Sequence, residues 1–153
     1  MRWTIRKGIG KREIIDSQGK ICGYLICKPF VCEILDCAGH CVKRVAKEAS
    51  LKIRIQGDGE ERCATLCLAK DASFISLPRA ESVTLPLEHS QLILRQLQDR
   101  EYSVCQDAQE IGWVTGIAGH PQIMLTQRTT FDFAGLLYVL ALWMYQEDDL
   151  EMV

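Results

Sequence analysis

The sequence predicts a mainly β protein, a closed antiparallel barrel of about twelve strands around a buried C-terminal hydrophobic helix at roughly residues 131–147. Three observations lead to this prediction. Short alternating apolar runs, broken by turn residues, extend from Trp3 to Arg128. One continuous apolar run follows, from Phe133 to Tyr145. The connections between the alternating runs are short, which makes most neighbouring strands antiparallel.

The predicted strands are recognised by apolar residues at every second position. In LKIRI, Leu51 to Ile55, the apolar residues face one way and the two cations the other. The same pattern is found in KICGYLIC, ERCATLCLAK, ASFISL, QLILRQL and PQIMLTQ, with turn-like QGDGEE, KDAS and QDREY between them. The segment 77–89 is expected to be the longest irregular piece, because Pro78 and Pro86 have no N–H to donate to a sheet.

A strand-turn-strand unit recurs, most clearly in EILDCAGHCVKRV, residues 33–45. Asp36 can accept a hydrogen bond from the backbone two residues on, and Gly39 can take a positive φ, so a three-residue hairpin loop is predicted. The expected register places these pairs opposite each other: Leu35 and Cys41, Ile34 and Val42, Glu33 and Lys43. This unit is interpreted as turn chemistry and not as a carboxylate site.

Two other segments resemble this unit. In EIIDSQGKICGYL the turn lies between Asp16 and Gly19, with Ile15 expected opposite Ile21. In YSVCQDAQEIGWV the position of the glycine is taken by Glu110, so a loop of another type is predicted there.

The apolar run near the C-terminus is predicted to be a helix inside the barrel. Its thirteen residues are too few to cross a bilayer, which needs roughly 20, so no transmembrane segment is expected. Thr130 or Asp132 can cap its first turn. Because apolar side chains cover every side, the helix must be surrounded by protein. A helix lying across an open sheet would carry a polar stripe, and none is visible.

Composition limits the classes of partner. A chain of 153 residues is expected to form a single domain spanning 1–153. Its 18 Lys plus Arg and 20 Asp plus Glu give a net charge of -2, so no nucleic-acid partner is expected. The N-terminal residues contain no apolar signal core, which predicts a reducing, cytoplasmic location, peripheral to a membrane if lipid is bound.

The eight cysteines are expected to be free thiols. Five of them form a regular series, Cys22, Cys27, Cys32, Cys37 and Cys41. No C-x-x-C pair is present, so these residues, with Cys63 and Cys67, are interpreted as buried, small apolar side chains. Metal binding or redox use is the alternative.

No local motif for catalysis or cofactor binding is found. His40, His89 and His120 are far apart and are interpreted as solvated or capping residues. GIGKREI does not satisfy the phosphate-loop pattern, because Lys11 is followed by arginine and a strand. No catalytic residue, metal ligand or cofactor is therefore predicted.

Basic residues near the N-terminus are the candidate binding residues. Arg2, Arg6, Lys7, Lys11 and Arg12 precede the first acidic residue, and Lys43 and Arg44 form a second group. Near anionic lipid each Lys or Arg can contribute about 1 kcal/mol, so these seven are candidate contacts to an anionic phospholipid. An ordinary solvated strand face is the alternative.

The strand-D-x-x-G-strand units, followed by FDFAGLLYVLALWMYQEDD, resemble the tubby C-terminal-like superfamily, in particular its LURP-one-related branch. Phospholipid scramblases are more distant kin. The resemblance implies the same barrel around a hydrophobic helix. The tubby proteins of this superfamily bind phosphoinositides through basic residues on the barrel exterior, whereas the LURP-one-related branch has no settled biochemical activity. A scramblase function is disfavoured, because no cysteine-rich run lies outside the predicted strands and no acidic calcium loop precedes the helix.

Two functions of different class remain. The first is a non-enzymatic binding or scaffold module that docks an anionic phospholipid, such as a phosphoinositide, or a protein partner on the barrel exterior. The alternative is a small-molecule carrier or an enzyme with a cavity beside the helix. Phe133, Tyr138 and Trp143 are large enough to fill the interior, which favours the first.

Overall fold

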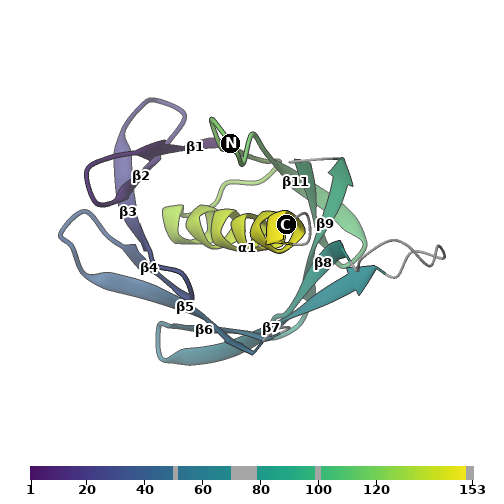
Figure 1. The fold of residues 1–153 in the computed structure, drawn as a ribbon. Helices are drawn as coiled ribbons and strands as arrows, with labels where there is room; N and C mark the ends of the chain where they lie inside the picture. The colour runs from purple at the N-terminus through teal and green to yellow at the C-terminus, as the bar shows by residue number, and fades with distance from the viewer. Residues whose placement is uncertain (50–51, 70–78, 99–100, 151–153) are drawn as a thin grey trace.

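The structure is a computed structural model that describes residues 1–49, 52–69, 79–98 and 101–150. Within these residues, twelve antiparallel strands form one closed barrel, and a single helix, α1, lies inside it (Figure 1). The predicted fold class is confirmed. The run ASFISL, which was expected to be a strand, lies outside the described residues.

The strands follow one another around the barrel in chain order. Their bounds are β1 Arg2–Lys7, β2 Arg12–Ile15, β3 Ile21–Cys27, β4 Val31–Leu35, β5 Cys41–Ala49, β6 Lys52–Gly57, β7 Glu60–Ala69, β8 Arg79–Pro86, β9 Gln91–Gln98, β10 Glu101–Gln106, β11 Gln109–Thr115 and β12 Gln122–Leu125. The barrel closes where β1 pairs with β12, with Trp3 opposite Ile123. Closure leaves no unpaired sheet edge between the first and last strands.

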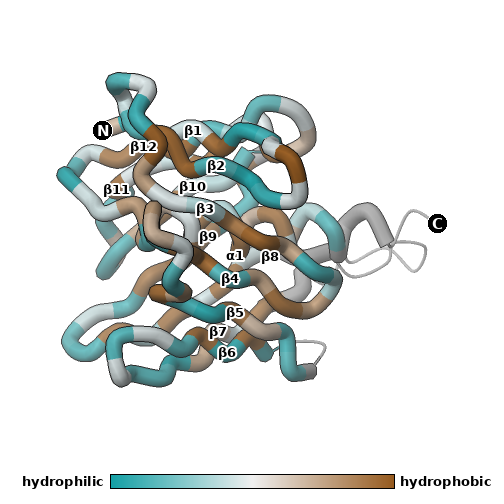
Figure 2. The backbone as a smooth tube through the Cα atoms, turned by 90° about the vertical axis from the view of Figure 1, so that its left-hand side faces the viewer, coloured by the Kyte–Doolittle hydropathy of each residue, from teal (hydrophilic) through white to brown (hydrophobic). Residues whose placement is uncertain are grey.

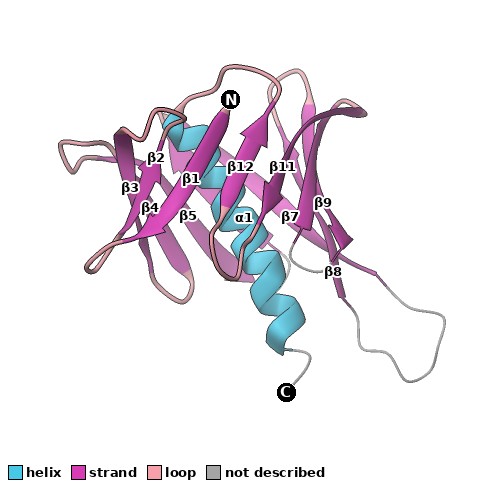
Figure 3. Cartoon of the chain, turned by 90° about the horizontal axis from the view of Figure 1, so that it is seen from above, coloured by secondary structure: helices cyan, strands magenta, loops and turns pink. Residues whose placement is uncertain are grey.

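The helix α1, Phe131–Leu150, begins where the sequence predicts and extends three residues beyond the predicted end at 147. Side chains on all sides of it are buried, including Leu137, Leu140 and Met144. Figure 3 shows α1 running along the inside of the barrel and leaving through one end. In the part of the chain that the structure describes, no helix is both long and apolar enough to cross a membrane.

Apolar side chains at every second position of the strands form the inner face of the barrel. Ile53 and Ile55 of β6 are buried, whereas Lys52 is exposed, as predicted. Figure 2 shows hydrophobic and hydrophilic segments alternating along the barrel wall. The inward side chains of the strands and the side chains of α1 therefore form one core.

The turn of the recurring unit is confirmed. The Gly39 N–H donates to the Asp36 carbonyl at 3.0 Å, the Ala38 N–H donates to Asp36 Oδ1 at 3.0 Å, and Gly39 has a φ of 88°. The first copy matches, with Ile15 opposite Ile21 and Gly19 at a φ of 84°. The third loop is of another type, as predicted, with positive φ at Asp107 and Ala108.

Part of the predicted register is wrong. Leu35 pairs with Cys41, but a bulge then shifts the strand, so that Ile34 pairs with Lys43 and Glu33 with Arg44. Val42 is the extra residue of this bulge. Its insertion turns Lys43 towards the interior, because side chains alternate along a strand and one added residue exchanges the two faces.

The prediction that residues 77–89 are irregular is also wrong, because residues 79–86 of this segment form β8. Val83 and Leu85 are buried in the core, which shows the period-two pattern of a strand. Pro86 is the last strand residue and lies opposite Gln91, at the start of β9. A proline at a strand end costs little, because the ladder continues no further there. Pro78 lies outside the described residues.

The expected burial of the cysteines holds only in part. Cys32 is fully buried, and Cys22 and Cys27 are half-buried. The prediction is wrong for four thiols that are exposed, Cys37, Cys41, Cys63 and Cys67. Residue type predicts average burial but not the face of the barrel on which a side chain lies. His40, His89 and His120 are exposed, in agreement with the solvated role expected for them.

Candidate functional site

Three of the seven candidate cations line one pocket. The basic pocket, as we call it, has a volume of about 310 Å³ and is lined by Lys7, Gly8, Gly10, Lys11, Arg12, Leu25 and Cys27. It lies at the end of the barrel through which the C-terminal end of α1 leaves, because β1 and α1 both run towards that end and Lys7 and Arg12 share a second pocket with Tyr145 of α1. We call this end the barrel mouth.

The β1–β2 hairpin brings these cations together. Lys7 ends β1 and lies opposite Arg12, the first residue of β2. The tip between them is closed by a hydrogen bond of 2.8 Å from the Gly8 N–H to the Lys11 carbonyl, and Gly10 has a φ of 72°. A tight turn with a glycine in the left-handed region therefore places three cations within five residues of one another at the mouth.

Arg12 points inward, to the helix. Its Nη1 donates a hydrogen bond of 2.7 Å to the Tyr138 hydroxyl, and its guanidinium lies 5.6 Å from the centre of the Tyr138 ring. Burial raises the pKa of Tyr138 to about 12, although the Arg12 charge opposes this change. Tyr138 is therefore a neutral hydroxyl at physiological pH, and it orients the cation without cancelling its charge.

Lys7 and Arg12 also border a second pocket at the mouth, of about 190 Å³. Its other side is formed by Tyr138, Leu142 and Tyr145 of α1 and by the 117–121 loop. Lys11 takes another direction, with Nζ 3.9 Å from the centre of the Tyr24 ring. Lys7 and Arg12 thus lie between the basic pocket and this second pocket.

The other four candidate cations lie elsewhere. On the outer wall, Arg6 Nε contacts Glu13 Oε1 at 2.8 Å. Lys43 points into the barrel and contacts Asp132 Oδ2 at 2.6 Å, beside the start of α1. Arg44 lies opposite Glu33 on the wall. Arg2 starts β1, at the end of that strand away from the mouth. The predicted residues therefore do not form one patch.

Two exposed apolar side chains at the mouth were missed by the sequence reasoning. Ile9, at the tip of the β1–β2 hairpin, is fully exposed, and Phe30, at the tip of the β3–β4 hairpin, is 66% exposed. Both tips lie at the mouth because β1 and β3, alternate strands of an antiparallel barrel, run towards the same end of it. The available signal was an apolar residue inside each turn, in GIGK and in KPFV.

A pair of thiols beside the basic pocket was also missed. Cys27 ends β3 and lies opposite Cys32 of β4, and Cys27 lines the basic pocket. A hydrogen bond from the Cys32 thiol lowers the pKa of Cys27, burial opposes this, and the Arg12 charge lowers it further. The signal was the C-K-P-F-V-C spacing, in which four residues can form a tight turn between two facing cysteines.

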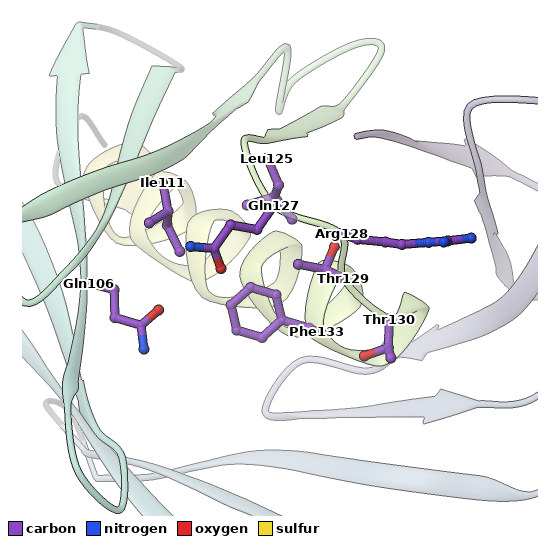
Figure 4. Close-up of a pocket in the computed structure, with 8 residues that line it drawn as sticks. All are labelled: Gln106, Ile111, Leu125, Gln127, Arg128, Thr129, Thr130 and Phe133. Atoms are coloured by element: carbon purple, nitrogen blue, oxygen red, sulfur yellow. The ribbon is translucent and has the colours of Figure 1, made fainter.

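The opposite end of the barrel also has pockets beside α1. One of about 280 Å³ is lined by Gln106, Ile111, Leu125, Phe133 and residues 127–130. Figure 4 shows the Phe133 ring and the Gln127 amide on the pocket side, whereas Arg128 extends away from the other side chains. The lining contains no histidine, cysteine or carboxylate. Tyr138 and Trp143 are buried as expected, whereas Phe133 is half-buried, and the two pockets described beside the helix lie towards its two ends.

No family model, curated protein or solved structure matches this chain. Within the described residues, no three His, Cys, Asp or Glu side chains are grouped in a way that could hold a metal ion. The geometry of the barrel mouth is therefore the basis for a functional proposal.

Proposed function

We propose that the protein is a non-enzymatic module that docks on membranes containing anionic phospholipid, with the barrel mouth as its binding surface. The observation that carries this proposal is the exposed Ile9 at a hairpin tip whose flanking residues, Lys7, Lys11 and Arg12, line the basic pocket. An apolar side chain inside a group of cations matches the interface of an anionic bilayer, where acyl chains lie beneath negative headgroups.

The energies involved suit reversible docking. Transfer of a fully exposed Ile or Phe side chain out of water is worth about 1.5–3 kcal/mol. Each cation near an anionic surface adds about 1 kcal/mol, and Lys28 beside Phe30 adds to the three of the basic pocket. Because the cost of association cancels much of this sum, we expect binding that weakens strongly with salt.

The basic pocket supports recognition of a headgroup phosphate. Arg12 is held in place by Tyr138, so it loses little conformational freedom when it contacts a phosphate oxygen. The resemblance to the tubby-like proteins supports a phosphoinositide as ligand. The surface proposed here is the mouth, whereas that resemblance implied the exterior wall.

Liposome sedimentation tests the proposal. Wild-type protein is mixed with phosphatidylcholine vesicles, alone or with added phosphatidylserine or phosphoinositide, at two salt concentrations. Binding is expected only to the anionic vesicles and is expected to fall at high salt. Lys7→Glu with Lys11→Glu should reduce binding at least tenfold, since reversing two charges removes more than the roughly 1.4 kcal/mol that corresponds to a factor of ten.

Matched variants separate charge from insertion. Ile9→Ser should weaken binding but preserve its salt dependence, because it removes only the apolar contribution. Arg128→Glu at the opposite end and Met124→Ser on the wall alter an exposed cation and an exposed apolar residue away from the mouth, and should leave binding unchanged. Wild-type protein that ignores every anionic vesicle would end the proposal.

The alternative of a small-molecule carrier or enzyme is supported by the pocket beside Phe133 (Figure 4). Its apolar residues and its amides could hold a small neutral ligand. Native mass spectrometry of the purified protein tests this alternative. An added mass that is lost in Phe133→Ala would favour it over membrane docking.

A further inference from the structure

We propose that Cys27 and Cys32 form a redox-active dithiol at the barrel mouth that reacts with small anionic disulfides such as glutathione disulfide. Cys27 is the attacking thiol, and Cys32 resolves the mixed disulfide. The proposal does not rest on membrane docking, since its chemistry involves two side chains of this chain and a soluble reagent.

The register of β3 and β4 makes a disulfide between these residues feasible. Opposite residues of an antiparallel ladder alternate between pairs that are joined by backbone hydrogen bonds and pairs that are not. Lys28 and Val31 form a pair of the first kind, because the Lys28 N–H donates a hydrogen bond of 2.8 Å to the Val31 carbonyl. The next pair along the antiparallel ladder, Cys27 and Cys32, is therefore a non-hydrogen-bonded pair. Such pairs have Cα atoms about 4.5 Å apart, which lies within the range of about 4.4–6.8 Å spanned by disulfides.

Accessibility divides the two roles. Cys32 has no exposed surface, whereas Cys27 is half-buried and lines the basic pocket. A soluble disulfide can therefore reach Cys27 but not Cys32. Cys32 is instead placed to attack an adduct on its neighbour.

The local electrostatics divide the roles in the same way. The Cys32 hydrogen bond lowers the pKa of Cys27, against the effect of burial, and the Arg12 guanidinium stabilises the thiolate further. The same hydrogen bond and burial raise the pKa of Cys32. A thiolate fraction on the accessible partner favours attack, because the thiolate is the nucleophile in thiol–disulfide exchange.

The charge of the pocket selects the class of disulfide. Lys7, Lys11 and Arg12 line the same pocket of about 310 Å³ as Cys27. The carboxylates of glutathione disulfide are attracted to these cations, whereas a cationic disulfide is repelled. The volume is within the range of small-ligand sites, about 300–1,000 Å³, and suits one arm of the reagent.

The exchange balances in two steps. The Cys27 thiolate attacks one sulfur of glutathione disulfide, the sulfur–sulfur bond breaks, and one glutathione thiolate leaves and takes up a proton from water. The Cys32 thiol then gives its proton to solvent and attacks Cys27 Sγ, which releases the second glutathione. Overall, the two cysteines lose two electrons and two protons, and glutathione disulfide is reduced to two glutathione molecules.

Mass spectrometry tests the proposal on the wild-type protein. The protein is incubated with glutathione disulfide, remaining thiols are alkylated, and trypsin with a Glu-specific protease releases residues 21–33, which contain both cysteines and Cys22. The expected product is a Cys27–Cys32 disulfide, located by fragmentation and also formed in Cys22→Ser. In Cys32→Ser, the reaction should stop at a glutathione adduct on Cys27.

The charge preference is measured as a rate. Cys27 should react with glutathione disulfide about tenfold faster than with the cationic disulfide cystamine at low salt, and added salt should reduce this ratio. Lys7→Gln with Lys11→Gln should also reduce it. Cys63, an exposed thiol on β7, serves as the internal comparison. The proposal is overturned if Cys27 reacts no faster than Cys63, if it shows no preference between the reagents, or if no bond to Cys32 forms.

Discussion

Arg12 on β2 donates a hydrogen bond of 2.7 Å to the hydroxyl of Tyr138 on α1, and its guanidinium lies 5.6 Å from the centre of the same ring. This contact joins the barrel wall to the central helix at the mouth. It also holds a half-buried cation where the basic pocket and the pocket beside Tyr145 meet. The helix therefore takes part in positioning the proposed binding residue as well as in filling the core.

Removal of the Tyr138 hydroxyl should destabilise the protein. Tyr138→Phe leaves Arg12 without its acceptor, and a hydrogen bond to a charged group is worth about 1.5–3 kcal/mol. We expect urea unfolding to show a loss near the lower end of this range, because Arg12 is only half-buried. Tyr24→Phe is the control, since its ring can still receive Lys11. Equal stability of Tyr138→Phe and wild type would contradict the role given to this contact.

The Lys43–Asp132 ion pair should make stability depend on pH. Burial raises the pKa of Asp132, but hydrogen bonds from Lys43 and Thr130 and the charge of Lys43 outweigh it, so the pKa is lowered. The pair then stabilises the fold above the unfolded pKa of about 3.9 and is lost as pH falls through the folded value. Asp132→Asn should cost about 1.5 kcal/mol at pH 7.

Denaturation of both proteins across a pH series checks this prediction. The difference in unfolding free energy between wild type and Asp132→Asn should be constant above about pH 5 and should close on acidification. Glu61→Gln is a suitable control, because its ion pair with Arg54 lies on the exposed wall. A difference that stays constant down to pH 2 would contradict the predicted role of the carboxylate.

The recurring turn needs glycine at its third loop position. Gly39→Val forces a branched side chain into the left-handed region, at a φ of 88°, which costs at least about 1–2 kcal/mol. Calorimetry should show a melting temperature lower by about 4 °C. Gly119→Val is the matched control, because Gly119 has open space and no positive φ. An unchanged melting temperature in Gly39→Val would refute the turn assignment.

Gly23 makes room for the first helix residue. A Cβ at Gly23 would lie 2.5 Å from the Phe131 ring and 2.7 Å from the Leu35 carbonyl oxygen. Gly23→Ala should therefore destabilise the protein, and Phe131→Ala should relieve part of that loss. In a double-mutant cycle we expect a favourable coupling of about 0.5–3 kcal/mol. Additive losses would show that the ring does not limit this position.

Much of the fold was predictable because its signals are local. The alternation in LKIRI and the all-apolar face of Leu137 and its neighbours depend only on backbone periodicity. The failures have the opposite character. Pro86 was taken as a strand breaker, although its cost depends on whether it ends the strand. The bulge at Val42 was missed because the register was counted with one residue opposite one residue, whereas both copies of the unit insert an extra residue after the turn, so that Ile14 pairs with Gly23 in the first copy as Ile34 pairs with Lys43 here.

The candidate site was predictable only as a stretch of sequence. Arg6 and Lys7 are neighbours in the chain, but Arg6 contacts Glu13 on the wall while Lys7 lines the basic pocket. Cys27 and Cys32 were interpreted separately, as members of a regular series. The β3–β4 turn makes them neighbours, and that turn contains the exposed Phe30.

The sequence by itself determined the barrel, the enclosed helix and the turn at Asp36 and Gly39, because hydrophobic periodicity and left-handed glycine are properties of the local chain. Only the tertiary structure decided which cations meet, that Lys43 turns inward to Asp132, and that Arg12 reaches Tyr138 across 126 positions of sequence. The physical reason is that adjacent residues of a strand face opposite sides. Closure of the barrel then brings residues that are distant in sequence to the same mouth, and local sequence patterns do not predict these contacts.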